Sequence, residues 1–195
     1  DGLPLFYDEN GEKSMSVNRF SRETSMLQYE GSREPLGSGG LTNTFSYGPF
    51  RISVLFTYSF GNKIRLNPLV SYYYNDTRAL DKELSNRWKL PGDEIYTNVP
   101  RIIDNTTKDE LQAGNADPFV YYNRSDLRVA DGSHVRLRNI TLMYDIPKHF
   151  LQKAGIEHAN IEIQGQNLYL LADPRLNGQD PEALVSGVNV PSPTV

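Results

Sequence analysis

Few side chains in this sequence have the type and spacing that catalysis or metal binding requires. Its three histidines, His134, His149 and His158, are far apart, so a metal site built from histidine is not expected. Cysteine is absent, which excludes disulfide bonds, thiolate ligands and cysteine nucleophiles. No Ser/His/Asp set, paired-carboxylate site or glycine-rich phosphate loop stands out. The sequence therefore predicts a protein that is not an enzyme, with no catalytic, cofactor-binding or metal-binding residues.

Acidic residues next to proline and glycine are the remaining candidates for binding. Asp93, Asp180 and Glu182 could line a substrate cavity or hold a cation, although capping and turn roles are the simpler expectation at such positions. The run DENGE at 8–12 has the composition of the start of a calcium loop. It lacks the later ligand spacing and the closing glutamate of an EF-hand, so we expect a turn there.

The composition indicates a β protein in which many aromatic rings lie between apolar and polar surroundings. The chain has 12 Tyr and 8 Phe but a single Trp, and β-strands favour such aromatic residues. Because 20 Lys+Arg stand against 24 Asp+Glu and no basic stripe is visible, nucleic-acid binding is not expected. With 195 residues, the chain is one ordinary domain or a piece of something larger.

The clearest β-strand is FRISVLFTYSF at 50–60. Its even-numbered residues are all apolar or aromatic, and they share one face because successive side chains of a strand point to opposite sides. Aromatic residues lie at both ends of this face, as at the two interfaces of a membrane. The segment is long for a globular strand, but about 9–11 residues are what a tilted strand needs to cross a bilayer.

Neighbouring segments extend this pattern. Segment 41–47 alternates in the same way and is joined to 50–60 by Gly48-Pro49, the signal of a two-residue hairpin. Segment 63–75 is predicted to be extended, with Pro68 limiting any strand pairing.

In the strand predicted over 134–145, the apolar residues change face midway. Val135 and Leu137 lie on one face, whereas the apolar residues from Ile140 onward lie on the other. A bulge near Arg138–Asn139, or a rise of the chain out of the membrane, would explain the change.

The connections between the strands alternate between short and long. Gly48-Pro49 and a small helix predicted over 147–154 are short, whereas 1–40, 61–133 and 172–193 are long. Outer-membrane barrels have short periplasmic turns and long extracellular loops. So few strands cannot close a barrel, and an open edge cannot face lipid. We therefore predict an all-β fold of antiparallel transmembrane β-strands that form part of a large outer-membrane β-barrel, with long extracellular loops and short helical insertions.

Polar residues that alternate with the apolar ones should face the lumen of such a barrel. In the strand predicted over 160–171, the polar positions lie opposite Ile161 and Ile163. Ion pairs between wall and plug are the simplest role for the arginines, and contact with an anionic substrate is the alternative. The residues expected to face the lumen are Arg136, Arg138, Glu162, Gln164 and Gln166.

The long connection 61–133 contains one predicted helix. It runs from Asp76, an N-cap candidate, to Trp88, because Leu80, Leu84 and Trp88 repeat at helical spacing. The stretch that follows, through Ser133, is polar and is predicted to be a long loop.

Four segments occur in a recognisable order and spacing and cover well over half of the chain. They are PLFYDENGE (4–12), GGLTNTFSYGPFRISVLFTYSFGNKI (39–64), RWKLPGDEIYTNVPRI (87–102) and SDLRVADGSHVRLRNITLMYDIPKHFLQKAGIEHANIEIQGQNLYLLAD (125–173), followed by Asp180-Pro181-Glu182. This ordered set resembles the C-terminal barrel region of the SusC/RagA family of TonB-dependent outer-membrane transporters, found in Bacteroidetes.

The resemblance implies a nutrient importer. Family members take up oligosaccharides or peptides through a plugged barrel, with a SusD-like surface lipoprotein as a lid and the TonB–ExbB–ExbD complex as the energy source. Residues 1–195 would then be the C-terminal segment of the barrel in the bacterial cell outer membrane, in contact with membrane lipid and the rest of the barrel. The N-terminal plug domain would lie outside this sequence. The final strand of the barrel, which is expected right after Val195, would lie outside it as well.

On this interpretation, the long loops are the places where substrate or the lipoprotein lid would bind. Trp88 could stack on a sugar ring or pack against the lid, although anchoring its own loop is the simpler expectation. The other candidates in the loops are Asp93, Asp180 and Glu182.

The alternative is a soluble, all-β ligand-binding module of the carbohydrate-binding type. In such a sandwich, the same apolar faces would pack into a core. Alternation alone does not separate an apolar face in contact with lipid from one in contact with a second sheet. Strand length and the order of short and long connections favour the barrel, and the ordered motifs favour it more strongly.

Overall fold

The computed structural model of the chain describes residues 1–8, 10–15, 27–70, 79–114, 118–152 and 155–183. They divide into two compact units. The strand unit comprises Ser32–Lys63 and Asp131–Leu176, and the loop unit comprises Asp1–Gly31, Ile64–Ala130 and Asn177–Val195.

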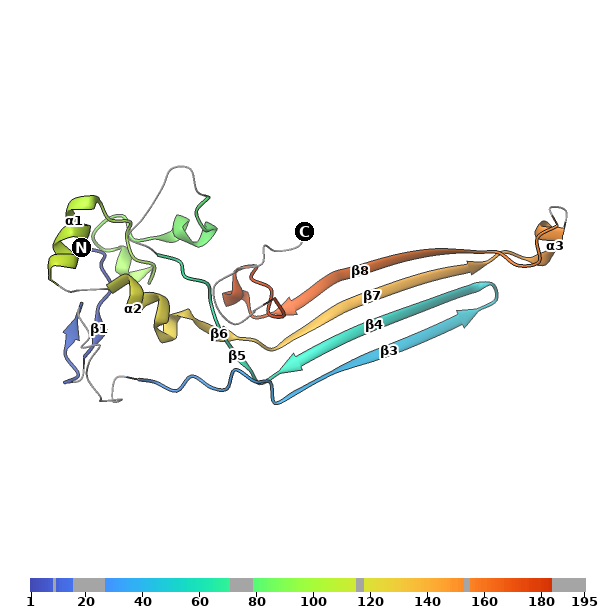
Figure 1. Ribbon diagram of the computed structural model, residues 1–195, viewed down its shortest axis with the longest axis horizontal. Helices are drawn as coiled ribbons and strands as arrows, with labels where there is room; N and C mark the ends of the chain where they lie inside the picture. The colour runs from blue at the N-terminus through green and yellow to red at the C-terminus, as the bar shows by residue number, and fades with distance from the viewer. Residues whose placement is uncertain (9, 16–26, 71–78, 115–117, 153–154, 184–195) are drawn as a thin grey trace. The chain divides into compact units, whose positions relative to one another are not determined.

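Four long antiparallel strands form the strand unit. They lie in the order β3-β4-β7-β8 (Figure 1), with the bounds β3 Gly37–Tyr47, β4 Phe50–Phe60, β7 His134–Asp145 and β8 Asn160–Ala172. The predicted strands 50–60 and 134–145 are confirmed at both ends, and 160–171 is confirmed with one more residue. The alternating sequence and the hairpin signal were therefore sufficient to locate this sheet.

β3 begins earlier than predicted, at Gly37 rather than at Leu41. Glycine has a low strand propensity, which hid these residues. Aromatic rings of β4 fill the space beside the glycines: a Cβ on Gly37 would lie 2.6 Å from the Phe60 ring, and one on Gly39 would lie 2.7 Å from the Tyr58 hydroxyl. The strand therefore requires glycine at both positions.

The sheet has one apolar face, and this face is exposed. Phe50 pairs with Tyr144 and Ile52 pairs with Leu142, and directly opposite residues of neighbouring strands share a face. Phe50 is 50% exposed, and Ile163, further along the same face on β8, is 66% exposed. The strand unit therefore presents its apolar side chains outward rather than packing them into a core.

A bulge at Arg138 explains why the apolar residues of β7 change face in the sequence. Phe56 pairs with Leu137, but its neighbour Leu55 pairs with Asn139, so Arg138 is one residue too many for a regular ladder. Val135 and Leu137 are thereby placed on the same face as the apolar residues that follow the bulge. Of the two explanations that the sequence offered, the bulge near Arg138–Asn139 is the one observed.

Both short connections lie at the same end of the sheet (Figure 1). Gly48 in the β3–β4 turn has φ 55°, a conformation that glycine adopts without strain. The β7–β8 connection contains α3, Lys148–Leu151, which is shorter than the predicted helix, and residues 153–154 lie outside the described residues. Because both short connections lie at one end of the sheet, the observed order of short and long connections agrees with the predicted alternation.

The remaining elements are short. Two small sheets pair β1 (Phe6–Tyr7) with β2 (Lys13–Ser14) and β5 (Lys63–Arg65) with β6 (Val129–Asp131). The helices are η1 Lys82–Asn86, η2 Asp93–Ile95, α1 Asn105–Ala113, α2 Pro118–Arg124, η3 Asp126–Arg128 and η5 Pro174–Leu176. No helix of the described residues combines the length and the apolar character of a membrane span.

The helix predicted from Asp76 to Trp88 is wrong where the structure describes it. Only the 3-10 helix η1 forms, capped by Asp81, whose side chain accepts a hydrogen bond from the Glu83 N–H. Leu84 is buried but Leu80 is exposed, so the expected apolar stripe does not form. The cap at Asp81 and the burial of Leu84 favour the short helix η1 over the longer helix that the spacing of Leu80, Leu84 and Trp88 predicted. Asp76 lies outside the described residues.

The long loop predicted up to Ser133 is also wrong, because it contains α1 and α2. Asp104 caps α1 by accepting a hydrogen bond from the Thr107 N–H at 2.7 Å, which lowers the pKa of the Asp104 carboxyl. α2 forms because Phe119 and Tyr122 are buried in the loop unit. Both helices are too short for a clear periodic pattern, so tertiary packing decides them.

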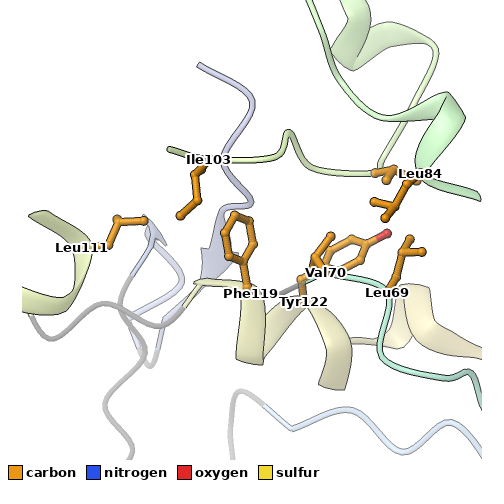
Figure 2. Close-up of a cluster of buried hydrophobic side chains, with 8 residues drawn as sticks. Leu69, Val70, Leu84, Ile103, Leu111, Phe119 and Tyr122 are labelled. Carbon is orange, nitrogen blue, oxygen red and sulfur yellow. The ribbon is translucent and has the colours of Figure 1, made fainter. Parts of the chain in front are cut away.

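A hydrophobic core holds the loop unit together (Figure 2). Phe119 is 1% exposed and lies among side chains from several segments that are far apart in the sequence. Segment 63–75, predicted to be extended, is a strand only at β5, and its Leu69 and Val70 enter this core instead; residues 71–75 lie outside the described residues. The core consists of Leu69, Val70, Leu84, Val99, Ile103, Leu111, Phe119 and Tyr122.

Candidate functional site

Asp93 builds the turn that follows Trp88. Its Oδ2 atom accepts hydrogen bonds from the backbone N–H groups of Lys89 and Leu90, both at 2.9 Å. These bonds favour the charged carboxylate and lower the pKa of Asp93. Gly92, immediately before it, has φ 105°, a backbone conformation that favours glycine. Asp93 therefore has the turn role that was the simpler expectation.

Trp88 anchors this loop through its indole ring. The indole Nε1–H donates to Glu94 Oε2 at 2.9 Å, and this bond is the main reason why the pKa of Glu94 is lowered. The ring also packs against Gly2, where a Cβ would lie 2.4 Å from it, and the Trp88 N–H donates to the Val99 carbonyl at 2.9 Å. The anchoring role is observed, but through Glu94 and Gly2 rather than through a leucine stripe.

The same turn exposes three apolar side chains that the sequence did not single out: Leu90, Ile95 and Tyr96, of which Tyr96 is 87% exposed. The order of the residues does not indicate which side chains face outward, because the hydrogen bonds that Asp93 and Glu94 accept determine the shape of the turn. The carboxylates of Asp93 and Glu94 accept hydrogen bonds from groups of the same turn, and the exposed side chains of Leu90, Ile95 and Tyr96 are apolar.

The other acidic candidates also occupy turns. Asp180 Oδ1 accepts a hydrogen bond from the Glu182 N–H at 2.9 Å, and Glu182 is exposed. Asp8 Oδ1 accepts from the N–H groups of Asn10 and Glu12 at 2.8 and 2.9 Å, so the predicted turn at 8–12 is confirmed. In the part of the chain that the structure describes, no cluster of three or more His, Asp and Glu residues could hold a metal ion.

The strand unit gathers four of the five residues expected to face the lumen on one polar face. Opposite residues share a face, and this face pairs Arg136 with Leu170, Asn139 with Gln166, Thr141 with Gln164 and Met143 with Glu162. Arg138 is different, since it occupies the bulge and donates from Nη1 to Asn167 Oδ1 at 3.1 Å. That these residues face a lumen stays a prediction.

Uncharged hydrogen-bonding groups cross the middle of the polar face. The hydroxyl oxygens of Thr44 and Ser53 lie 3.1 Å apart on β3 and β4. On β7, Asn139 Nδ2 donates to Thr141 Oγ1 at 3.0 Å, and Gln164 Nε2 of β8 donates to Asn139 Oδ1 at 2.8 Å. The row reaches all four strands and offers hydroxyl and amide groups without a net charge.

Arg128 is a buried link within the loop unit that the sequence did not reveal. It is 3% exposed, and its Nη1 forms an ion pair with Glu83 Oε1 at 2.7 Å. Nη2 donates to the Asn67 carbonyl at 2.7 Å, and the guanidinium lies 6.0 Å from the Tyr122 ring, whose hydroxyl pKa is raised by burial. Arg128 thus joins three segments of the loop unit.

Asn123 fixes a further segment beside the core. Its Oδ1 accepts from the N–H groups of Leu69 and Val70 at 2.9 and 3.3 Å, and its Nδ2 donates to the Val70 carbonyl at 2.8 Å. These bonds satisfy backbone groups that have no strand partner. These contacts stabilise the loop unit, which also contains the turn formed by residues 88–96, here called the Trp88 turn.

No family model matches the chain. Two proteins of Formosa agariphila are similar to almost all of it. TonB-dependent receptor P26 is 29% identical over 189 residues, which is 96% of this chain and 17% of that protein. TonB-dependent receptor P3 is 29% identical over 183 residues, 93% of this chain and 16% of that protein. The chain thus spans less than a fifth of the length of these relatives.

Two solved structures share the fold. The RagAB peptide transporter matches with a TM-score of 0.57 and 22% identity, covering 92% of this chain and 18% of that chain. The RagAB peptide importer in the open-open state matches with a TM-score of 0.52 and 20% identity, covering 90% and 19%. The chain therefore has the fold of a barrel segment of RagAB. The fold class expected from the sequence is confirmed, and the expected resemblance to TonB-dependent transporters agrees with the names of the relatives.

The barrel fold of these solved structures explains the exposed apolar face of the strand unit. The outward face of an outer-membrane barrel is an apolar band flanked by aromatic residues. Phe50 and Tyr144, with ring centroids 4.8 Å apart, lie near one end of β4, and Tyr58 and Phe60 stack at the other. The names of the relatives and of the solved structures are those of receptors and transporters rather than of enzymes.

Proposed function

We propose that this chain forms part of the wall and of the surface loops of an outer-membrane nutrient importer. The importer takes up oligosaccharides or peptides, is energised through TonB–ExbB–ExbD, works with a SusD-like surface lipoprotein and has no enzymatic activity. The observation that carries the proposal is a four-stranded sheet whose apolar face is exposed and whose opposite face is polar. A wall between lipid and a hydrated pathway needs these two faces.

The strand lengths support a membrane span. The four strands have between 11 and 13 residues. At about 3.4 Å per residue and a tilt of roughly 40–45°, ~11 residues cover ~26–29 Å, close to the ~25 Å apolar band of such barrels. The polar face, with Arg136, Glu162, Gln164 and Gln166, would then line the lumen.

The edges of the sheet support a larger barrel. β3 and β8 are the outer strands of the described sheet, and an unpaired strand edge is unfavourable in lipid because its N–H and C=O groups lack partners. Further strands of the same polypeptide would pair with both edges. On this proposal, residues 1–195 are the C-terminal segment of the barrel, and the plug domain with its TonB contact belongs to the part of the protein outside this sequence.

The loop unit would form part of the extracellular surface. Along the chain, its segments adjoin the ends of the four long strands that are not joined by the short turns. Barrels of this kind place short turns in the periplasm. The turn that carries Leu90, Ile95 and Tyr96 is the best candidate for contact with substrate or with the lipoprotein lid. Trp88 and Asp93 would act by holding this turn in shape.

The soluble binding module is less consistent with the described residues. A sandwich needs a second sheet over the apolar face, whereas the other sheets described have two strands each. An exposed apolar face of this size on a soluble monomer would cause aggregation.

The test uses the full protein in its own cells. An epitope tag is inserted at Gly178, in an exposed turn of the loop unit, or at Gly48, in the β3–β4 turn. We expect the Gly178 tag to bind antibody on intact cells and the Gly48 tag to bind only after permeabilisation. Equal access to both tags, or a protein in the soluble fraction, would contradict the barrel.

Import is tested separately. Uptake of labelled oligosaccharide mixtures and peptide mixtures is compared between cells with and without the protein, in the presence and absence of a proton uncoupler. Loss of uptake of one class, together with co-purification of a surface lipoprotein, is expected. Unchanged uptake of both classes would contradict the importer while leaving the barrel intact.

A further inference from the structure

At one position along the strands of the sheet, β7 and β8 contain extra residues. β4 has no extra residue there, β7 has one and β8 has two. β4 is regular between Leu55 and Phe56, whereas β7 inserts Arg138 opposite this step. β8 in turn inserts two residues, Asn167 and Leu168, opposite the single Arg138. The two irregularities therefore lie side by side and form a stacked bulge.

Asn167 and Arg138 connect the two halves of the stacked bulge. Asn167 has φ 52°, a left-handed conformation that asparagine tolerates better than most residues. Its Oδ1 accepts the hydrogen bond from Arg138 Nη1 at 3.1 Å. Leu168 fits beside Gly165, where a Cβ would lie 3.0 Å from the leucine side chain. Each inserted residue of β8 thus has a specific local fit.

The alternative to the stacked bulge is a regular β7. In a regular strand, every second residue shares a face, so Arg136 and Arg138 would share the apolar face with Ile140. Val135 and Leu137 would then share the polar face. Arginine on the lipid face of a barrel is strongly unfavourable near the midplane and less so near the interfaces.

We propose that Arg138 and Asn167 are positioning residues that determine which side chains of β7 face the lumen on the N-terminal side of the bulge. Together they keep Arg136 on the lumen side and Val135 and Leu137 in lipid. The inference depends on the proposed function only in that one face contacts lipid. It adds a role for Arg138 other than contact with substrate or plug.

The experiment labels single cysteines in the full protein in native membranes, and the chain itself contains no cysteine. Val135→Cys and Leu137→Cys report on the part of β7 that is N-terminal to the bulge. Leu142→Cys, on the apolar face, and Thr141→Cys, on the polar face, both lie C-terminal to the bulge and are the matched controls. A lipophilic maleimide should modify the cysteines at 135, 137 and 142 but not at 141.

Asn167→Val removes the hydrogen-bond acceptor and strains the left-handed backbone, since a β-branched residue is disfavoured there. We expect labelling at 135 and 137 to fall by about tenfold, because the regular phase becomes populated, while labelling at 142 stays unchanged. Asn167→Gly keeps the backbone conformation and removes only the acceptor, so its labelling should fall less. Asn167→Gly also keeps the test valid if Asn167→Val does not insert.

A variant that lacks Arg138, Asn167 and Leu168 provides a second, independent check. Without the extra residues, regular alternation alone places Leu137 in lipid and Asn139 in the lumen, so the original labelling should return. Unchanged labelling in both Asn167 variants, or loss of labelling at 137 in the shortened variant, would overturn the inference. Absence of labelling at 142 in the unmodified protein would instead contradict the proposed membrane wall.

Discussion

In the loop unit, Phe119 and Leu84 are 1% and 3% exposed, whereas in the strand unit Phe50 and Ile163 are 50% and 66% exposed. Both units contain many apolar side chains, but the hydrophobic core that the described residues form lies in the loop unit. The loop unit is thus built like a small water-soluble domain, and the strand unit like a wall with lipid on one side. In water, apolar side chains are stable when they are buried against one another, as in the loop unit. In lipid, apolar side chains can face outward while the backbone groups must pair, as in the strand unit.

The largest expected effect concerns the loop unit. Phe119→Ala should lower the stability of the loop unit by about 3–5 kcal/mol, because it leaves a cavity in the core. Phe150→Ala, at an exposed position of α3, is the control. Limited proteolysis of the full protein should show faster cleavage within the loop unit for Phe119→Ala alone, while the heat-induced gel shift of the barrel persists. If the barrel also lost its heat shift, the two units would not be independent.

A charge on the lipid face should affect the barrel instead. Val54→Arg should lower barrel stability by roughly 2–4 kcal/mol, because the arginine would lie near the midplane of the apolar band. Ser53→Arg, one residue away on the polar face, should have much less effect. Urea denaturation of the folded protein in detergent measures both variants. Equal losses of stability would show that the face of Val54 does not contact lipid.

Two substitutions in the Trp88 turn separate its framework from its exposed surface. Trp88→Ala removes the bond to Glu94 and the packing on Gly2, so protease cleavage at the turn should increase. Tyr96→Ala should leave cleavage unchanged but reduce uptake or co-purification of the lipoprotein by about fivefold or more, if the ring is a central contact. A Tyr96→Ala variant with normal uptake and normal co-purification would argue against a binding role.

The smallest expected effect is a pH dependence of the same turn. Because the pKa values of Asp93 and Glu94 are lowered by the fold from 3.8 and 4.5, their contribution to stability is present above these values and is lost as the pH falls below them. The ¹⁹F signal of 5-fluorotryptophan at position 88, assigned with Trp88→Phe, should shift below about pH 4.5. Glu94→Gln should remove most of this shift, and a full shift in that variant would contradict the assignment.

Much of the strand unit was predictable from local patterns. The alternation in 50–60 and the Gly48-Pro49 hairpin are properties of adjacent residues, and the change of face in β7 indicated the bulge. The loop unit was not predictable in the same way. α1 and α2 are too short for periodicity, and α2 exists because Phe119 reaches a core that distant segments complete. The roles of Trp88 and Asp93 within the turn were expected, but the exposure of Tyr96 was not.

The sequence by itself located the four long strands, except for the start of β3, and it indicated the resemblance to SusC/RagA transporters and a change of face in β7. The reason is that strand alternation, turn residues and ordered motifs are encoded locally. Only the tertiary structure decided that Arg128 links three segments, that Asn167 lies beside Arg138, and that the turn after Trp88 shows an apolar surface. These features depend on which distant residues come together, and no spacing along the chain specifies such contacts.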